Sequence, residues 1–409
     1  MDIKRDVKFA CNKLAIKKLR KHQQKPINAI LNEQDTLSIA PTSAGKSAIY
    51  QIPAILHPDK PTLVVEPTLS LLHDQVQKLK SQGISVEYID STLTKSEQQK
   101  ILTSFAKGNL NILYLTPERL QSESFLCALS HIRLFMLVVD ECHCVLDWGY
   151  SFRESYLLIG KFVDSLSYRP VIAAFTATAS EYDIEQICKL LSMKDTAIFI
   201  NDLYRKNLTF IKKYAADRSV KQRLLMKYLR KYHNNSTVIY CNTKIAVDAV
   251  YEFLQKKFPG EVVKCHSAMS AKKRTEHELE FLTGEKTIMV ATSAFGMGID
   301  LDALDLVVHF NMPLSIIDYM QQAGRAGRNG QRAHCILLYD DTDYFVSQGI
   351  LSDVPDETAQ KRALMRLDEI KDYCDDNDNC MAQMLLSSFG QKSKKPCNHC
   401  TNCQKSRRS

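Results

Sequence analysis

The sequence predicts an α/β protein with two doubly wound parallel sheets, followed by a small helical module rich in cysteine. Short β-branched or aliphatic runs alternate with helical patterns over residues 36–339, as is typical of parallel sheets covered by helices. Nine such runs are more than one domain of ordinary size accommodates, so we divide them between two domains. After Asp340 the pattern becomes helical and then cysteine-rich, which indicates the third module.

Each predicted strand is a short apolar run that ends in a loop. The predicted strands cover residues 36–40, 62–66, 111–115, 137–139, 171–175, 237–240, 287–291, 306–310 and 333–339. Helices are expected from Lys46, over 71–82, from Arg119, after Asp140 and over 246–257. The polar stretch Ile200–Asn207 is the predicted linker, so the expected domains are residues 1–203, 204–342 and 343–409.

The composition is that of an ordinary globular protein. The 409 residues are 45% hydrophobic and 24% charged, which excludes full-length disorder, a collagen-like repeat and a disulfide-rich miniprotein. The densest apolar run, residues 134–139, is far shorter than the ~20 residues that a membrane helix needs. The N-terminus has no apolar segment like that of a secretory signal. We therefore expect an intracellular protein with no membrane partner.

The net charge of +8 is unevenly distributed. Residues 1–25 carry nine basic and two acidic side chains, and residues 381–409 carry six basic side chains and none that is acidic. The residues between them are therefore mildly acidic. Basic ends favour a polyanion such as nucleic acid. The alternative is that they are solvated helix faces and a solvated tail.

A candidate phosphate-binding loop follows the first predicted strand. Residues 40–47 read Ala-Pro-Thr-Ser-Ala-Gly-Lys-Ser and open a predicted helix, so backbone N–H groups would face an anion. Lys46 is expected at the β- and γ-phosphates, the Ser47 hydroxyl on Mg²⁺, and Gly45 at a close backbone approach. Ala40 stands where the usual pattern has its first glycine, and the motif alone is weak evidence.

The partner of this loop is Asp140-Glu-Cys-His143, directly after the apolar run 134–139. A carboxylate at the end of a buried parallel strand lies where such sheets bind ligands. Asp140 is expected to hold Mg²⁺, and Glu141 to orient and deprotonate the attacking water. An acidic loop that caps the next helix is the alternative. Both motifs, in this order and setting, favour binding and hydrolysis of a nucleoside triphosphate.

With these motifs in place, the sequence resembles superfamily 2 helicases, and more specifically the RecQ family. The resemblance runs from about Leu14 to Cys403 and implies two RecA-like domains. It rests on segments in the family's order, at residues 19–23, 40–54, 66–75, 114–119, 140–153, 175–179, 238–242, 265–268, 291–300 and 321–328. Segment 140–153 is similar to the aromatic-rich loop that marks RecQ proteins and holds the only tryptophan.

The resemblance implies roles for individual residues. The implied ATP-binding residues are Arg20, Gln23, Thr42, Ser43, Ala44, Gly45, Lys46 and Ser47, with Gln23 reading adenine through its amide. The implied catalytic residues are Lys46, Asp140, Glu141, Arg325 and Arg328, and the implied Mg²⁺ ligands are Ser47 and Asp140. Arg325 and Arg328 are three residues apart and are expected on one helix face, with Arg328 stabilising the leaving phosphates.

The resemblance also implies DNA contacts, at Pro67, Thr68, Arg119, Trp148, Phe152, Arg153, His266 and Thr292. Trp148 and Phe152 offer flat apolar faces on which unpaired bases can stack, whereas the alternative is an aromatic cluster in a core. The chain departs from the family's pattern at Ile16, at residues 43–45, at Tyr150-Ser151 and at Gln322. These departures leave Lys46, Asp140, Glu141 and Arg328 in place.

The 13 cysteines fall into two groups. Nine are scattered through residues 11–374 and are expected to be small buried hydrophobes and free thiols, Cys374 among them. The other four, Cys380, Cys397, Cys400 and Cys403, have a spacing that suits tetrahedral Zn²⁺. They also resemble the zinc-binding subdomain of RecQ proteins. An iron–sulfur cluster and a reduced, unliganded tail are the alternatives.

The function that the resemblance implies is an ATP-dependent 3′-to-5′ DNA helicase of repair or recombination. It would act on single-stranded and tailed duplex DNA with ATP, Mg²⁺ and Zn²⁺, in the nucleoid of a bacterium or the nucleus of a eukaryote. The chain stops six residues after Cys403, so we expect a short form without winged-helix and HRDC domains. The alternatives are an RNA helicase, a DNA-stimulated ATPase or translocase with little unwinding, and a strand-annealing scaffold.

Overall fold

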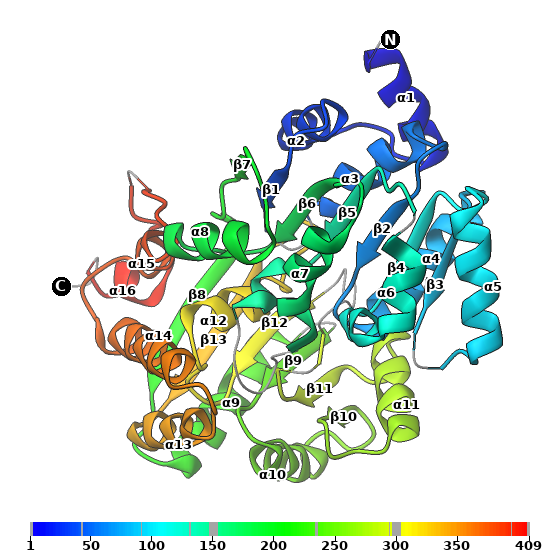
Figure 1. Cartoon of the computed structure of the whole chain (residues 1–409). Helices are drawn as coiled ribbons and strands as arrows, with labels where there is room; N and C mark the ends of the chain where they lie inside the picture. Colours follow the sequence, from blue (N-terminus) through cyan, green and yellow to red (C-terminus); the bar gives the residue numbers. More distant parts are fainter. Residues whose placement is uncertain are drawn as a thin grey trace. The chain divides into compact units, whose positions relative to one another are not determined.

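The computed structural model describes residues 3–41, 44–90, 92–130, 132–146, 154–233, 236–293, 295–296, 304–393 and 395–406. The chain forms two compact units, of which the first ends at Asp202 and the second begins at Leu203. Figure 1 shows a sheet covered by helices in each unit. The predicted class, two doubly wound parallel sheets and a helical C-terminal module, is confirmed.

The first unit contains a seven-stranded sheet of order β3-β4-β2-β5-β6-β1-β7, in which every pair of neighbours is parallel. Its strands are β1 Thr36–Ile39, β2 Thr62–Val65, β3 Val86–Ile89, β4 Ile112–Leu115, β5 Met136–Val139, β6 Val171–Thr176 and β7 Ala197–Ile200. Alternate side chains of a strand enter opposite apolar cores, so Leu137 packs on one face of the sheet and Val138 on the other.

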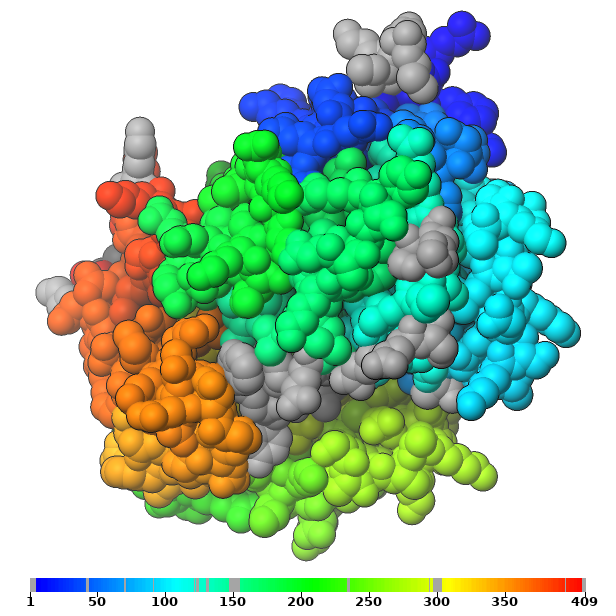
Figure 2. Space-filling model, in the orientation of Figure 1, coloured from blue at the N-terminus to red at the C-terminus, as the bar shows by residue number. Residues whose placement is uncertain are grey.

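The helices of the first unit are α1 Ile3–Lys13, α2 Lys21–Leu31, α3 Lys46–Leu56, α4 Leu69–Ser81, α5 Lys95–Ala106, α6 Glu123–Ser130, α7 Leu158–Ser165 and α8 Glu181–Leu190, with short 3₁₀ turns η1 Pro117–Gln121, η2 Cys142–Val145 and η3 Glu154–Leu157. Helix α5 starts with a capping box and has Leu102 and Phe105 as its buried residues. Figure 2 shows this helix, in cyan, on the surface. All strands run in one direction, so the loops after β1, β2 and β5 emerge at the same edge of the sheet.

The second unit contains a six-stranded parallel sheet of order β10-β11-β9-β12-β13-β8. Its strands are β8 Leu208–Tyr214, β9 Ser236–Tyr240, β10 Val262–Cys265, β11 Ile288–Ala291, β12 Leu304–His309 and β13 Ala333–Tyr339. Its helices are α9 Arg218–Tyr232, α10 Lys244–Gln255, α11 Ala271–Leu282, α12 Ile316–Ala323, α13 Asp341–Ser352, α14 Glu357–Asp375, α15 Met381–Ser387 and α16 Thr401–Lys405.

The C-terminal helices share an apolar core with this second sheet. Tyr373 of α14 and Leu385 of α15 pack in the same buried cluster as Phe210 of β8 and Leu337 of β13. The hydroxyl of Tyr339 donates a hydrogen bond to the carbonyl oxygen of Cys374 at 2.7 Å. The cysteine-rich module is therefore built onto one face of the sheet.

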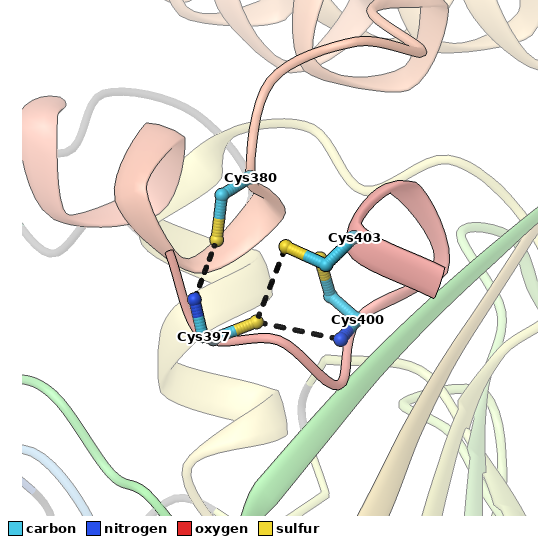
Figure 3. A group of neighbouring side chains, drawn as sticks. All are labelled: Cys380, Cys397, Cys400 and Cys403. Atoms are coloured by element: carbon cyan, nitrogen blue, oxygen red, sulfur yellow. Dashed lines mark hydrogen bonds between the residues drawn. The ribbon is translucent and has the colours of Figure 1, made fainter. Parts of the chain in front are cut away.

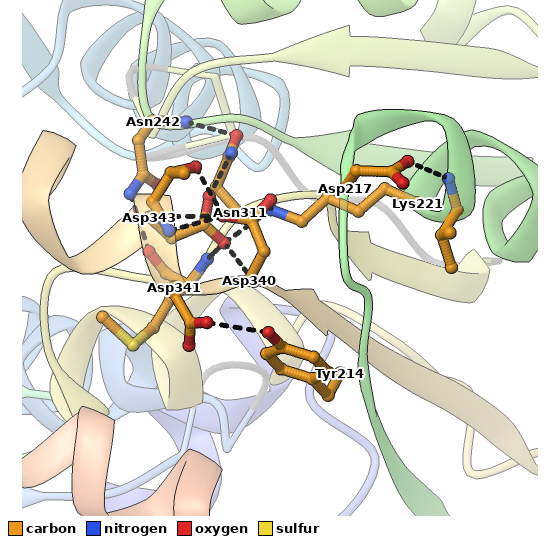
Figure 4. A network of polar contacts seen from close by, with 11 residues as sticks. Tyr214, Asp217, Lys221, Asn242, Asn311, Asp340, Asp341 and Asp343 are labelled. Atoms are coloured by element: carbon orange, nitrogen blue, oxygen red, sulfur yellow. Dashed lines mark hydrogen bonds and ion pairs between the residues drawn. The ribbon is translucent and has the colours of Figure 1, made fainter.

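A buried lysine network fastens α9 to the ends of β12 and β13 (Figure 4). The side chain of Lys221 is 2% exposed, and its Nζ lies 2.8 Å from Asp340 Oδ2 and 2.7 Å from Asp343 Oδ2. Asp343 also accepts a hydrogen bond of 2.8 Å from Asn311 Nδ2, and Asp340 caps α13. Each carboxylate of this network thus has both the cation and further donors.

Candidate nucleotide site and metal centre

The phosphate-binding loop leads directly into α3. Gly45 is the N-cap of α3 with φ of +75°, a conformation that favours glycine. A Cβ atom at this position would lie 2.8 Å from Gln23 Nε2, so close approach requires glycine as well. Lys46 and Ser47 form the first turn of α3, where backbone N–H groups favour an anion. Thr42 and Ser43 lie outside the described residues.

Lys46 and Glu141 form the centre of the predicted catalytic group. Lys46 Nζ lies 3.5 Å from Glu141 Oε1, and the two side chains are 10% and 19% exposed. Burial lowers the pKa of the Lys46 ammonium, but the carboxylates of Glu141 and Asp140 together raise it above its usual value. Lys46 therefore stays a cation in a buried setting, as a phosphate ligand must.

Asp140 and Glu141 follow β5 at the carboxyl edge of the sheet. Asp140 Oδ1 accepts a hydrogen bond of 2.9 Å from the backbone N–H of Glu141, which has φ of +45°. Burial, with the charge of Glu141, raises the pKa of Asp140 to about 6, although the attraction of Lys46 acts against this. A second buried carboxylate, Glu66 after β2, is 0% exposed. The group has more carboxylates than cations, which fits Mg²⁺ because this ion prefers oxygen ligands.

His143 and Thr176 extend this group; the sequence placed both in helicase segments, 140–153 and 175–179, but predicted no individual role for either. His143 Nδ1 lies 3.3 Å from Glu141 Oε2 and 3.0 Å from Thr176 Oγ1. Thr176 ends β6 and its hydroxyl also donates to the carbonyl oxygen of Thr178 at 3.1 Å. The signal was present in the Asp-Glu-Cys-His segment, which directly follows β5, and in the Phe-Thr-Ala-Thr-Ala segment, which spans the end of β6 in the same sheet.

The segment expected to read adenine lies against the phosphate loop. Gln23 Nε2 donates to the carbonyl oxygen of Gly45 at 2.8 Å, and Gln23 Oε1 accepts from the backbone N–H of Arg20 at 2.8 Å. His22 Nε2 lies 3.0 Å from the carbonyl oxygen of Ala44. Ile16 is half-buried against an apolar core. The start of α2 therefore supports the loop, and the contact of Gln23 with adenine stays a prediction.

The second unit positions Arg325 and Arg328 in turns after α12. This helix ends at Ala323, so the expectation that both arginines share a helix face is wrong. Gly327, with φ of +57°, interrupts the helical conformation between them. Arg325 is 4% exposed and its Nη1 donates to the carbonyl oxygen of Gly296, whereas Arg328 is half-buried. A Cβ at Gly296 would lie 2.9 Å from the Arg325 guanidinium.

Two residues from the start of this unit hold the arginine turn, and no motif pointed to them. Arg205 donates from Nη1 to the carbonyl oxygen of Gly324 at 2.6 Å and from Nη2 to that of Gly327 at 2.5 Å. Asn207 Nδ2 donates to the carbonyl oxygen of Gly327 at 2.8 Å. Because these contacts span about 120 residues of sequence, local patterns carry no sign of them.

A buried histidine contacts α12, the helix that leads into the turn of Arg325 and Arg328. His309 ends β12, and its Nε2 lies 2.9 Å from Oε1 of Gln322 in α12. Burial lowers the pKa of His309 to about 3, although the hydrogen bond with Gln322 opposes this. At neutral pH the ring is therefore uncharged and donates from Nε2 to Gln322.

The described residues that were expected to contact DNA follow strand ends within their own units. Pro67 and Thr68 come after β2, with Thr68 as the N-cap of α4, and Arg119 lies in η1 after β4. His266 and Thr292 follow β10 and β11. Contacts with DNA stay a prediction for all five.

His266 is 6% exposed and its Nε2 lies 3.2 Å from Asp248 Oδ1. The aromatic-rich loop falls outside the described residues, including the predicted contacts Trp148, Phe152 and Arg153.

The four C-terminal cysteines converge on one point (Figure 3). The sulfur atoms of Cys380, Cys397, Cys400 and Cys403 all lie within 4.8 Å of one another. A tetrahedral zinc ion with Zn–S bonds of ~2.3 Å needs sulfurs roughly 3.8 Å apart, so this donor set fits Zn²⁺. A hydrogen bond from the Cys397 thiol lowers the pKa of Cys400 to about 4, although burial opposes this. Cys374, as predicted, is a free buried thiol outside the cluster.

The cysteine loop is tied to the edge strand β8. The two ring nitrogens of His399 lie 2.6 Å from the carbonyl oxygen of Cys397 and 3.0 Å from that of Leu208. The backbone N–H of Lys212 donates to Thr401 Oγ1 at 3.1 Å. The cluster thus anchors the C-terminal segment to the sheet.

The chain matches three protein families. Residues 20–187 match the DEAD/DEAH box helicase family, residues 220–330 the helicase conserved C-terminal domain, and residues 340–404 the RecQ zinc-binding domain. Among solved structures, the DNA-bound helicase MrfA is 17% identical with a TM-score of 0.68, over 98% of this chain and 57% of that one. RNA-bound Mss116 is also 17% identical, with a TM-score of 0.68 over 94% and 88%. These structures show the same fold of two RecA-like domains.

Curated relatives are more similar in sequence. The ATP-dependent DNA helicase RecQ of Bacillus subtilis is 36% identical over 391 residues, which are 95% of this chain and 65% of that protein. RecQ of Haemophilus influenzae is 33% identical, and the chain spans 61% of its length. RecQ of Synechocystis is 32% identical over 333 residues, covering 80% of this chain and 69% of that protein. The chain therefore belongs to the RecQ family of helicases.

Proposed function

We propose that this protein is an ATP-dependent DNA helicase that moves 3′ to 5′ on single-stranded DNA and unwinds duplexes, in DNA repair or recombination. The observation that carries this proposal is the group of Lys46, Asp140 and Glu141 at one edge of a parallel sheet, beside a helix N-terminus that favours phosphate. The names of the Bacillus, Haemophilus and Synechocystis relatives support DNA as the substrate.

In this mechanism, Lys46 and the N–H groups at the start of α3 bind the phosphates of ATP. Glu141 orients the attacking water and accepts its proton, while His143 fixes the position of the Glu141 carboxylate. Arg325 and Arg328 stabilise charge on the leaving phosphates. Ser47 and Asp140 hold Mg²⁺, which when bound neutralises phosphate charge.

DNA lies, in this proposal, across Pro67, Thr68, Arg119, Trp148, Phe152, Arg153, His266 and Thr292. The four clustered cysteines hold Zn²⁺, and the match of residues 340–404 to the RecQ zinc-binding domain favours zinc over an iron–sulfur cluster. Metal analysis of the purified protein is expected to find one zinc per chain, and iron in its place would overturn this assignment. Among the helices that the structure describes, none has the length and apolarity to cross a membrane.

Strand displacement on duplexes with a 3′ or a 5′ single-stranded tail tests the proposal. ATP-driven unwinding from the 3′ tail alone, absent in Lys46→Ala, is the expected result. DNA-stimulated ATP hydrolysis without displacement would indicate a translocase. Activity that survives Glu141→Ala would indicate a scaffold in which ATP binding only changes the affinity for DNA.

A second arm of the experiment compares DNA with RNA. A mimivirus relative that is 31% identical, over 94% of this chain and 69% of its own length, is named a putative ATP-dependent RNA helicase. We expect single-stranded DNA to stimulate ATP hydrolysis more than RNA of the same sequence. The reverse order would contradict DNA as the substrate.

A further inference from the structure

Glu66 leaves the sheet directly beside the predicted magnesium ligand Asp140. Strands β2 and β5 are parallel neighbours with Val65 in register with Val139, so the next residue of each strand, Glu66 or Asp140, emerges at the same level. The backbone N–H of Asp140 donates to the carbonyl oxygen of Val65 at 3.0 Å. The topology therefore brings two carboxylates together at the nucleotide edge of the sheet.

The Glu66 side chain is buried without any hydrogen-bond partner. It is 0% exposed, and neither of its carboxylate oxygens has a partner within the described part of the chain. The nearby hydroxyls of Tyr50 and Tyr114 lie 3.3 Å from each other and do not satisfy it. A buried carboxylate with no donor is costly, so its presence beside a candidate metal site requires a physical reason.

The charges around Glu66 indicate a cation. Among the residues that the structure describes, Glu66, Asp140 and Glu141 face one ammonium, that of Lys46. The register of β2 and β5 places Glu66 beside Asp140, and Glu141 follows Asp140 directly, so these carboxylates lie close to one another. A divalent cation offsets this surplus of negative charge and offers water molecules as hydrogen-bond donors.

We propose that Glu66 is an additional carboxylate of the divalent-cation site, where it strengthens the binding of the cation that accompanies the nucleotide. This inference rests on the proposed ATP-binding function and assigns to Glu66 a role that the helicase motifs did not give it. Its oxygens would accept hydrogen bonds from water carried by a bound cation. Loss of such a carboxylate in the outer shell of a metal site typically weakens metal binding by 10–100-fold.

Binding of Mn²⁺ in the presence of ADP, followed by electron paramagnetic resonance of the free ion, measures this role without ATP turnover. We expect Glu66→Gln to weaken Mn²⁺ binding by about tenfold. Glu66→Ala should show the same loss, and Glu66→Asp should retain most of the affinity because it keeps the charge. Tyr114→Phe is the matched control, since it removes a buried hydroxyl of the same cluster without changing its charge.

A second titration, of fluorescent ADP in the presence of EDTA, separates the inference from the proposed function. We expect the wild type and Glu66→Gln to bind metal-free ADP equally. Unchanged Mn²⁺ affinity in Glu66→Gln, or an equal loss in Tyr114→Phe, would overturn the role of Glu66 alone. If the wild type binds no ADP under either condition, the nucleotide site and the role of Glu66 fall together.

Discussion

Each unit of this protein contains a buried lysine that faces carboxylates at the ends of parallel strands, and the two differ in how completely their charges are satisfied. Lys221 has two carboxylate oxygens within 2.8 Å, and further donors bind those carboxylates. Lys46 has its nearest carboxylate oxygen at 3.5 Å, and Glu66 beside it has no hydrogen bond among the described residues.

This difference separates a structural network from a binding site. When every charged group of a network is paired, none is available to bind a ligand. The pairing also offsets the free-energy cost of burying the charges. A charged group without a close partner can still bind a ligand of opposite charge, such as a nucleotide or a cation. Replacing Lys221 should therefore mainly reduce stability, and replacing Lys46 should mainly reduce activity.

The largest expected effect is on stability. Lys221→Met removes the cation and leaves Asp340 and Asp343 buried without it, so we expect the free energy of unfolding to fall by about 3–5 kcal/mol. Urea unfolding followed by circular dichroism measures the change. Lys227→Met is the matched control, because Lys227 is an exposed lysine of the same helix and should cost under about 0.5 kcal/mol. Similar losses in both variants would contradict a structural role for the network.

The second effect is on activity. Lys46→Ala removes the cation that binds phosphate, and we expect DNA-stimulated ATP turnover to fall by about 10²–10³-fold. Stability should fall by less than in Lys221→Met, because the 3.5 Å contact of Lys46 with Glu141 is longer than both contacts of Lys221 with its carboxylates. The control is Lys60→Ala, which breaks a partly exposed contact of 3.8 Å with Glu33. A large loss of stability in Lys46→Ala would show that both lysines are structural.

The position of a strand in its sheet explains whether the sequence predicted it. All nine predicted strands are present, and the four that were missed, β3, β7, β8 and β10, are the edge strands of the two sheets. Central strands are buried on both faces and read as continuous apolar runs. Edge strands are partly exposed and include polar residues, as in Val86-Glu-Tyr-Ile89, so an apolar-run criterion overlooks them.

The sequence predicted those residues of the site that stand in a short recognisable motif. Lys46, Asp140 and Glu141 stand in motifs next to buried strands, so local spacing was enough to find them. Glu66 and Arg205 act through contacts set by strand order and chain folding, which a single sequence does not reveal. The helix expected at the arginine pair is absent because α12 ends at Ala323 with Gly324 as its C-cap, and Gly327, with φ of +57°, lies between the two arginines.

His309 provides a third case, a buried ionisable group whose partner is neutral. Its pKa of about 3 lies below the unfolded value of about 6.5, so the unfolded chain binds more protons between these values. Stability is then complete above about pH 6.5 and falls on acidification by about 1.4 kcal/mol per pH unit.

Gln322→Glu tests this by placing a carboxylate beside the His309 ring. We expect the pKa of His309 to rise and the acid-induced loss of stability to become smaller, as measured by urea unfolding from about pH 7 to about pH 5. His309→Gln is the companion variant, which has no titrating ring and should lose the corresponding slope. Identical pH profiles for all three proteins would contradict the assignment.

The smallest effect concerns the turn that holds Arg325 and Arg328. Arg205→Lys keeps the charge but replaces a fork that reaches two carbonyl oxygens with a single point donor. A loosened turn misplaces both arginines while the phosphate loop in the first unit is untouched, so we expect ATP turnover to fall by about tenfold, or ~1.4 kcal/mol, with KM unchanged. Lys206→Ala, at the exposed position between Arg205 and Asn207, is the control and should retain full turnover. A raised KM with unchanged turnover would mean that Arg205 acts on nucleotide binding, and the arginine turn would then belong with the saturated, structural networks of this unit.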